Sequence, residues 1–287
     1  PGGVVFWFRR DLRLHDAPAL THAVQLARQR GVGLHPVVVT DPAQTCATTA
    51  WGFARRGQHR AQWEAEAVAG LAQALLALGT PLRHLHGPVA QVLPALASQL
   101  GATELVCEAI PCPEELGQVA ALRASGLVVH TVWASTLVAP AALPFAPEQV
   151  PDVFTTFRQR LETAGVREAA PLPTVSTWPT GPAQGVGAVP MAAATEAAQQ
   201  PPNAPDPLRP PSPGDGAPQP LPGSEAAALA HLQAYCAGLH PHHYKATRNA
   251  LMGEHTSSRW SPWLATGALS ARQAMAAIRQ FETEHGA

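Results

Sequence analysis

The chain has 287 residues, 46% of them hydrophobic, which is enough for two modest domains with a sizeable core. Its formal net charge of -1 argues against a protein that coats nucleic acid with its whole surface, and leaves a local basic groove open. The four cysteines form no Cys-x-x-Cys pair, and there is no secretory leader or membrane-spanning run. We therefore expect a cytoplasmic protein without disulfides, a zinc site or membrane contact.

Strands and helices alternate over the first half of the chain. The run 4–8 is short, apolar and without polar alternation, which predicts a strand buried on both faces. Further strands are expected at 37–39, 81–86, 104–109 and 127–132, and helices at 18–30, 56–78, 89–100 and 114–124. This alternation predicts an α/β fold with a parallel, Rossmann-like sheet in residues 1–135.

A polar loop, residues 9–16 (Arg-Arg-Asp-Leu-Arg-Leu-His-Asp), follows the first predicted strand. It lacks the Gly-x-Gly-x-x-Gly pattern of dinucleotide-binding sheets. Open α/β sheets nevertheless place ligands at the carboxyl ends of their strands. Two interpretations stay open: a ligand-binding loop, or a network of Arg and Asp side chains that holds the loop in place.

The pattern changes in the second half of the chain. Residues 136–223 are rich in Pro and Gly, apart from one helix expected within 151–164, and they predict a long interdomain linker or wrapping loop. Residues 224–287 contain a helix that opens at Ser224 and a final helix near 271–284. We expect this last part to be a portion of an all-helical domain.

A stretch of hydroxyl, amide and Arg side chains in the helical part carries strong signals of helix starts and ends. Ser261 and Pro262 predict the N-cap and the first residue of a short helix. Gly267 can end that helix in the left-handed conformation. Ser270 with Gln273 has the spacing of a capping box that opens the next helix.

Ser257, Ser258 and Arg259 therefore lie just before a predicted helix N-terminus. Backbone N–H, hydroxyl and guanidinium groups in such a place favour an anion, phosphate above all. The alternative is an ordinary corner between helices with a solvated arginine, and the spacing alone favours that alternative. Three nearby histidines without carboxylate or Cys partners at ligand spacing predict a loop and no metal site: His240, His242 and His243.

Several segments resemble the photolyase/cryptochrome family. Residues 7–16 (Trp-Phe-Arg-Arg-Asp-Leu-Arg-Leu-His-Asp) are similar to its N-terminal signature, and signatures within 257–272 are similar to its flavin-binding region. Segments within 143–158 and 244–265 are similar to the DASH branch of the family. The segments occur in the family's order and cover most of the chain apart from the linker, so the resemblance is specific.

The resemblance implies an α/β domain that holds a light-harvesting antenna in many members, and a helical domain that binds FAD. It implies light-driven chemistry, in which reduced flavin passes an electron to a cyclobutane pyrimidine dimer in DNA and the dimer splits. DASH members resemble photolyases most in acting on single-stranded or looped DNA, so such DNA is the expected partner of a monomeric protein. No catalytic side chain is assigned.

Residue by residue, the resemblance implies two sets of contacts. The positions that match residues around the FAD diphosphate are Tyr244, Ser257, Ser258, Arg259, Trp260 and Ser261. Arg248 matches a position that faces DNA phosphate, and Lys245 would add sequence-independent attraction to it. A surface ion pair is the alternative for Arg248.

The sequence also departs from the family pattern. Family members continue well beyond Ala287, so we expect a partial FAD pocket and no repair activity of the chain as it stands. The alternative function is a non-catalytic nucleotide-binding or blue-light signalling module. Ile110 aligns with the carboxylate that often contacts a folate antenna, and Ala17 replaces the usual Asn. Glu108, two positions before Ile110, is then a weak antenna candidate; this argues against folate and leaves another antenna, or none, open.

Overall fold

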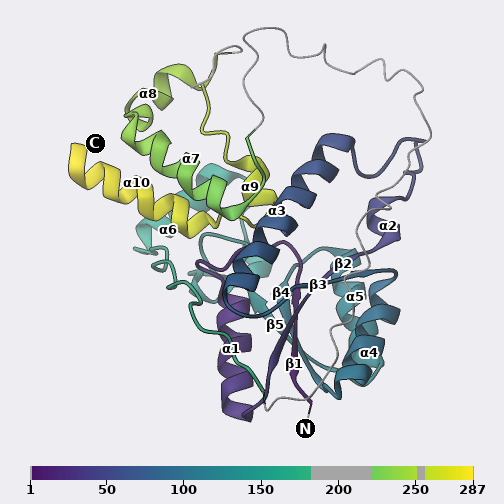
Figure 1. Ribbon diagram of the computed structural model, residues 1–287. Coiled ribbons are helices and arrows are strands. Elements are labelled where there is room, and N and C mark those ends of the chain that lie inside the picture. Colours follow the sequence, from purple (N-terminus) through teal and green to yellow (C-terminus); the bar gives the residue numbers. More distant parts are fainter. Residues whose placement is uncertain (1, 182–220, 251–255, 287) are drawn as a thin grey trace, which may run out of the picture.

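The computed structural model describes residues 2–181, 221–250 and 256–286, and its first half forms a five-stranded parallel sheet (Figure 1). The strands are β1 (Val4–Phe8), β2 (Leu34–Thr40), β3 (Arg83–His86), β4 (Glu104–Ala109) and β5 (Val128–Trp133). Their order in the sheet is β3-β2-β1-β4-β5. The reversal of strand order between β1 and β4 is the point where open α/β sheets form a crevice at the strands' carboxyl ends. The predicted α/β class and the parallel sheet are confirmed.

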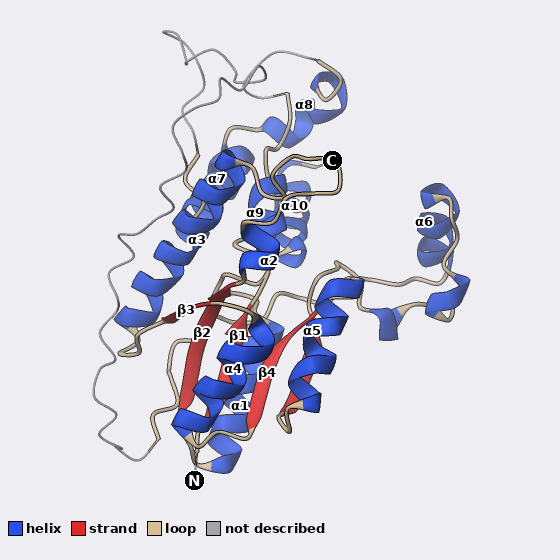
Figure 2. Cartoon of the chain, turned by 90° about the vertical axis from the view of Figure 1, so that its right-hand side faces the viewer, coloured by secondary structure: helices blue, strands red, loops and turns tan. Residues whose placement is uncertain are grey.

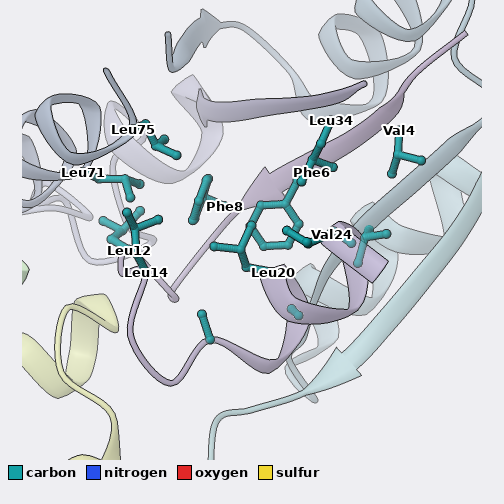
Figure 3. Close-up of a cluster of buried hydrophobic side chains, with 14 of the residues drawn as sticks. Val4, Phe6, Phe8, Leu12, Leu14, Leu20, Val24, Leu34, Leu71 and Leu75 are labelled. Atoms are coloured by element: carbon teal, nitrogen blue, oxygen red, sulfur yellow. The ribbon is translucent and has the colours of Figure 1, made fainter. Parts of the chain in front are cut away.

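Helices cover both faces of this sheet (Figure 1). They are α1 (Pro18–Arg30), α3 (Gln58–Ala77), α4 (Val89–Leu100) and α5 (Pro113–Ala124), while the short α2 (Pro42–Thr45) follows β2 and buries no residue. Val4, Phe6 and Phe8 point into a core with α1 and α3, where the rings of Phe6 and Phe8 meet edge to face at 4.5 Å (Figure 3). Val5 and Trp7 point into the opposite core with α4 and α5. All of β1 is buried, as its apolar run predicts.

The chain after β5 leaves the α/β unit and then returns to it. It forms η1 (Pro140–Ala142), η2 (Pro147–Gln149) and α6 (Phe154–Thr163), and α6 stands apart from the other helices (Figure 2). The returning segment lies along the α/β unit: Val175 N–H donates to Leu14 O at 3.2 Å, and Trp178 Nε1 donates to Leu34 O at 2.8 Å. Residues 172–179 of the predicted linker are therefore packed against the sheet layer. Residues 182–220 of that prediction lie outside the described residues.

The described residues of the C-terminal part form the helices α7 (Glu225–Ala237), α8 (His240–Thr247), α9 (Ser261–Thr266) and α10 (Ala271–His285). Their core surrounds Trp263, which is fully buried and lies 5.2 Å, centroid to centroid, from Trp63 of α3. The helical part therefore rests on a helix of the α/β unit. Among the described residues, no helix combines the length and the apolar character needed to cross a membrane.

Two local predictions for this part are wrong. Ser261 was predicted as the N-cap of α9, but it is the first residue of the helix and Trp260 takes the N-cap position. The helix starts one residue early because the backbone angles of Trp260 (φ -80°, ψ -18°) are already in the helical range. The predicted loop around His240, His242 and His243 is helix α8, with a proline in its first turn. Proline is tolerated there because the first-turn N–H groups have no partner within the helix.

Two other predictions are confirmed. Gly267 ends α9 with φ 72°, in the left-handed region. Ser270 and Gln273 form the complete capping box of α10. The Ser270 hydroxyl accepts the Gln273 N–H, and the Gln273 side-chain oxygen accepts the Ser270 N–H. These two features place α9 and α10 at a fixed angle to each other.

The polar loop after β1 holds the helical part against the sheet. Leu12 N–H donates to Thr266 O at 3.3 Å, and Arg13 Nη1 donates to Gly267 O at 2.9 Å. The carboxylate of Glu225, at the start of α7, accepts the N–H groups of Leu14 and His15, each at 2.9 Å. Of the two interpretations of residues 9–16, the geometry favours the network that holds the loop, and the network extends to the helical part.

Candidate functional site

The predicted anion-binding segment, residues 257–261, crosses the side of α7 on its way into α9. The imidazole Nε2 of His231 lies 2.9 Å from the carbonyl oxygen of Ser258. The next residue, Arg259, has φ 57°, a left-handed value that non-glycine residues adopt at a cost of about 1 kcal/mol. The chain therefore makes a sharp, side-chain-supported turn between Ser258 and Trp260.

Trp260 connects this segment to α7. Its ring packs edge to face against that of Tyr235 of α7, with centroids 5.1 Å apart. Tyr235 is buried, and burial raises the pKa of its hydroxyl, with a further contribution from the neighbouring Tyr244. Tyr235 thus packs on Trp260 and lies near enough to Tyr244 to be affected by its hydroxyl, so both predicted site residues lie near the same residue of α7.

The segment presents hydrogen-bond donors that have no partner in the described structure. The backbone N–H groups of Ser258, Arg259 and Trp260 meet no acceptor among the described residues. The Arg259 guanidinium has no ion pair or hydrogen bond within the same ranges, and the buried Trp260 Nε1 also has none. Ser257 and Ser261 are exposed. This set of groups is rich in donors, and its one charged side chain is a cation, as the binding of an anion requires.

Lys245 and Arg248 lie in and just after α8, and both are exposed. In the described part of the chain, neither side chain forms an ion pair or a hydrogen bond. The surface ion pair that was the alternative for Arg248 is therefore not found there. Two cations in and just after one short helix suit a polyanion, because no described residue neutralises their charges.

Two residues that support the site, His231 and Tyr235, are absent from the sequence-based prediction. They are four residues apart on α7 and therefore share one side of the helix. Their partners Ser258 and Trp260 lie 27 and 25 positions further along the chain. A His and a Tyr at helical spacing, in a helix otherwise rich in Ala and Leu, were the only available signal.

Glu108 lies in a different place, at the carboxyl end of β4. Burial raises the pKa of its carboxyl to about 8, helped by the neighbouring Asp11, whose own pKa is raised by burial as well. Glu108 Oε1 accepts from the Ser135 hydroxyl at 3.0 Å, while Glu108 Oε2 and Asp11 Oδ2 have no partner among the described groups. Glu108 is 2% exposed, and Ile110 beside it is buried too. A ligand would reach this carboxyl only by displacing a neighbour.

Two hollows in the described structure lie away from the predicted site residues. A groove of about 550 Å³ lies between α7 and α10, lined by apolar side chains such as Leu232, Cys236 and Phe281. A smaller one, about 150 Å³, lies under the chain after β5, beside Trp133 and Arg272. No cluster of three or more potential metal ligands occurs among the described residues.

Comparisons with known proteins agree with this architecture. The sequence model described as DNA photolyase matches residues 4–176. A cryptochrome DASH of Gloeobacter violaceus is 34% identical over 286 residues, which are 98% of this chain and 54% of the relative. A cryptochrome DASH of Xenopus laevis is 32% identical, over 99% of this chain and 53% of the relative.

Solved structures give the same result. The crystal structure of a Synechocystis cryptochrome superposes with a TM-score of 0.82 at 30% identity, over 100% of this chain and 57% of that one. A bacterial class III photolyase from Agrobacterium tumefaciens shares the fold, with a TM-score of 0.71 at 22% identity over 100% of this chain and 54% of that one. The chain spans about half the length of the curated relatives it matches. Its matched residues, its strand order and its helical C-terminal part together show that the chain belongs to the DNA photolyase family.

Proposed function

We propose that this chain supplies the diphosphate-binding wall of an FAD site in a light-driven, DASH-like protein that splits cyclobutane pyrimidine dimers in DNA. One observation carries the proposal: the segment 257–261 is anchored to α7 and carries hydroxyl, guanidinium and backbone donors that have no partner among the described residues. Anions bind where such donors are already oriented, because little has to be rearranged on binding.

The donor set fits the FAD diphosphate in its chemistry. The hydroxyls of Ser257, Ser258 and Ser261 would donate to its oxygens, and Arg259 would neutralise its charge. No Asp or Glu occurs from Thr256 to Ser261 to repel it. Tyr244 would flank the group near Trp260, because Trp260 packs on Tyr235 and Tyr244 lies close enough to Tyr235 to influence its pKa. When bound and reduced, FAD supplies the light-excited electron that the family uses on the dimer.

The DNA strand would be attracted by Lys245 and Arg248. Contacts of this kind are made to phosphate, so they position a strand and carry no sequence information. A dimer must leave the base stack to reach a flavin, and this costs less in single-stranded or looped DNA. We therefore propose such DNA as the substrate.

Three further expectations belong to this proposal. Glu108 stays a weak candidate for contact with an antenna, and its carboxyl is buried and largely neutral at pH 7. With no exposed carboxylate at this position, we propose that the protein binds an antenna other than folate, or none. We also propose a monomer located in the cytoplasm, which size-exclusion chromatography with light scattering and cell fractionation would test.

The diphosphate assignment is tested by comparing three ligands. FAD and ADP both contain a diphosphate, whereas riboflavin contains none. Titration calorimetry of the purified chain should show that Ser258→Ala with Arg259→Ala weakens FAD and ADP by about 10- to 100-fold, the worth of a charge-assisted hydrogen bond. Riboflavin should be unaffected. Arg158→Ala, which removes a cation from an exposed ion pair on α6, is the matched control.

Equal FAD affinity in the double variant and the control would refute the diphosphate assignment. The repair function needs a separate experiment, in which a thymine-dimer oligonucleotide is illuminated with blue light in the presence of the reduced protein. Restored thymine absorbance supports a repair enzyme. Flavin binding without light-dependent repair is the result expected of the chain as it stands, and it leaves both a repair enzyme and a blue-light signalling module open.

A further inference from the structure

His231 of α7 is placed to control the geometry of the segment 257–261. Its Nε2 lies 2.9 Å from the Ser258 carbonyl oxygen. A carbonyl oxygen can only accept, so Nε2 carries the proton of this hydrogen bond. Within the described ranges, this is the hydrogen bond that ties the backbone of 257–259 to another element.

The imidazole ring itself is held in a fixed orientation. It packs on Trp263 with ring centroids 5.0 Å apart and an interplanar angle of 37°. Trp263 is fully buried, and its Nε1 donates to Pro222 O at 2.9 Å. A histidine packed against such a ring has few alternative rotamers, so the direction of its Nε2–H is set by the helical core.

The effect of this bond on the next residue follows from peptide geometry. The described peptides are all trans, and in a planar trans peptide the N–H points opposite to the C=O. Because His231 draws the Ser258 carbonyl toward α7, the Arg259 N–H points away from α7. That N–H has no acceptor among the described residues, and Arg259 is held at φ 57°.

We propose that His231 is a positioning residue for the ligand site: by donating to Ser258 O, it holds the turn at Arg259 so that its backbone N–H and guanidinium face the anion. The ligand class is a diphosphate, so this inference rests on the proposed function. His231 itself does not touch the ligand. Its contribution is preorganisation, because a turn that is already formed costs less to order on binding.

Two substitutions separate hydrogen bonding from packing. His231→Phe keeps a ring against Trp263 and removes the donor, whereas His231→Gln keeps an N–H donor of similar reach. We expect His231→Phe to weaken FAD and ADP about tenfold, equivalent to about 1.4 kcal/mol, and to leave riboflavin unchanged. His231→Gln should restore most of the affinity. His242→Phe, a histidine of α8 whose ring packs on Phe281, is the control.

A ligand-free measurement keeps this inference separate from the function. Trypsin cleaves after Arg259, and mass spectrometry of the fragments 1–259 and 260–287 follows that single bond. We expect faster cleavage in His231→Phe than in His231→Gln, His242→Phe or the parent chain. If the parent chain binds neither FAD nor ADP, the proposed function falls, while the cleavage rates still decide whether His231 holds the turn. Unchanged cleavage and unchanged FAD affinity in His231→Phe would overturn the inference.

Discussion

Arg272 of α10 forms an ion pair with Asp16 of the loop after β1, and its Nε lies 3.1 Å from Asp16 Oδ2. Asp16 is fully buried, and the same carboxylate accepts the hydroxyl of Ser270 and the N–H of Leu172. One side chain therefore joins the sheet layer, the start of α10 and the returning segment after α6. This junction fixes how the helical part, with the candidate site, sits on the α/β unit.

We expect Asp16→Ala to destabilise the protein by about 3 kcal/mol, because Arg272 and two other donors lose a buried acceptor. Urea unfolding followed by tryptophan fluorescence measures this. Arg158→Ala provides the comparison: its partner Glu162 is exposed on α6, so a change within about 0.5 kcal/mol is expected. Equal effects of the two substitutions would show that the Asp16 junction carries no special stability.

A second contact between the helical part and the α/β unit depends on Gly267, which lies close to the backbone of Arg10. A Cβ added to Gly267 would lie 1.8 Å from the carbonyl oxygen of Arg10, and its φ of 72° also disfavours a side chain. Gly267→Ala should therefore cost at least about 2 kcal/mol and push α9 away from the sheet. Gly117→Ala, in open space on α5, should instead stabilise by about 0.5–1 kcal/mol. Thermal unfolding of both variants checks the contrast, and a Gly267→Ala protein as stable as the parent would contradict it.

Much of the fold follows from local signals. The apolar run of β1, the glycine at the end of α9 and the Ser270–Gln273 capping box each require a short stretch of sequence only. Helix α8 was missed because it has no buried residue and therefore no apolar stripe. Its support comes from α7, where Tyr235 packs on His240 at 5.5 Å. Such a long-range contact has no signature in local periodicity.

The residues proposed to face the ligand could be selected from the sequence, whereas the residues that support them could not. Hydroxyls and an arginine near a helix start indicate an anion, whatever the fold. The Ser258–His231 hydrogen bond joins two segments that are far apart in the sequence. The same is true of the bond from Arg13 to Gly267, which holds the end of α9 against the loop after β1. The one-residue error at Ser261 has a similar origin, because the turn at Arg259 brings Trp260 into helical geometry first.

Glu108 should make stability depend on pH. Its pKa is raised from 4.5 to about 8, chiefly by burial, so the folded state holds a proton that the unfolded state releases. The protein should lose stability as pH rises between these two values. Glu108→Gln removes the ionisation, so its stability relative to the parent should grow from about pH 4.5 to about pH 8. Denaturant unfolding across this range is the measurement; a constant difference would contradict a neutral Glu108.

His15 is expected to act in the same direction at the junction with α7. Hydrogen bonding to Glu225 is the main cause of its raised pKa, and the bond joins Nδ1 to Oε1 at 2.8 Å. A raised histidine pKa adds stability that is complete below its unfolded value of about 6.5 and lost as pH rises through the folded value. His15→Ala should therefore cost more stability at about pH 5.5 than at about pH 8.5. A larger cost at the higher pH would rule out this pair as a charged contact.

Lys245 and Arg248 should act on DNA through phosphate alone. Each contact with a single strand contributes about 0.7 to the slope of log affinity against log salt, so Lys245→Ala and Arg248→Ala should each lower the slope by about that amount. Fluorescence anisotropy with labelled oligonucleotides, in KCl from about 50 to 200 mM, measures the slope. Arg30→Ala is the control of equal charge, because Arg30 lies at the far end of α1 and pairs with Glu104. The loss of DNA affinity in Lys245→Ala and Arg248→Ala should be the same for oligonucleotides of different sequence. A loss confined to one sequence, or an equal change in slope for Arg30→Ala, would show that these cations do not form the proposed phosphate contacts.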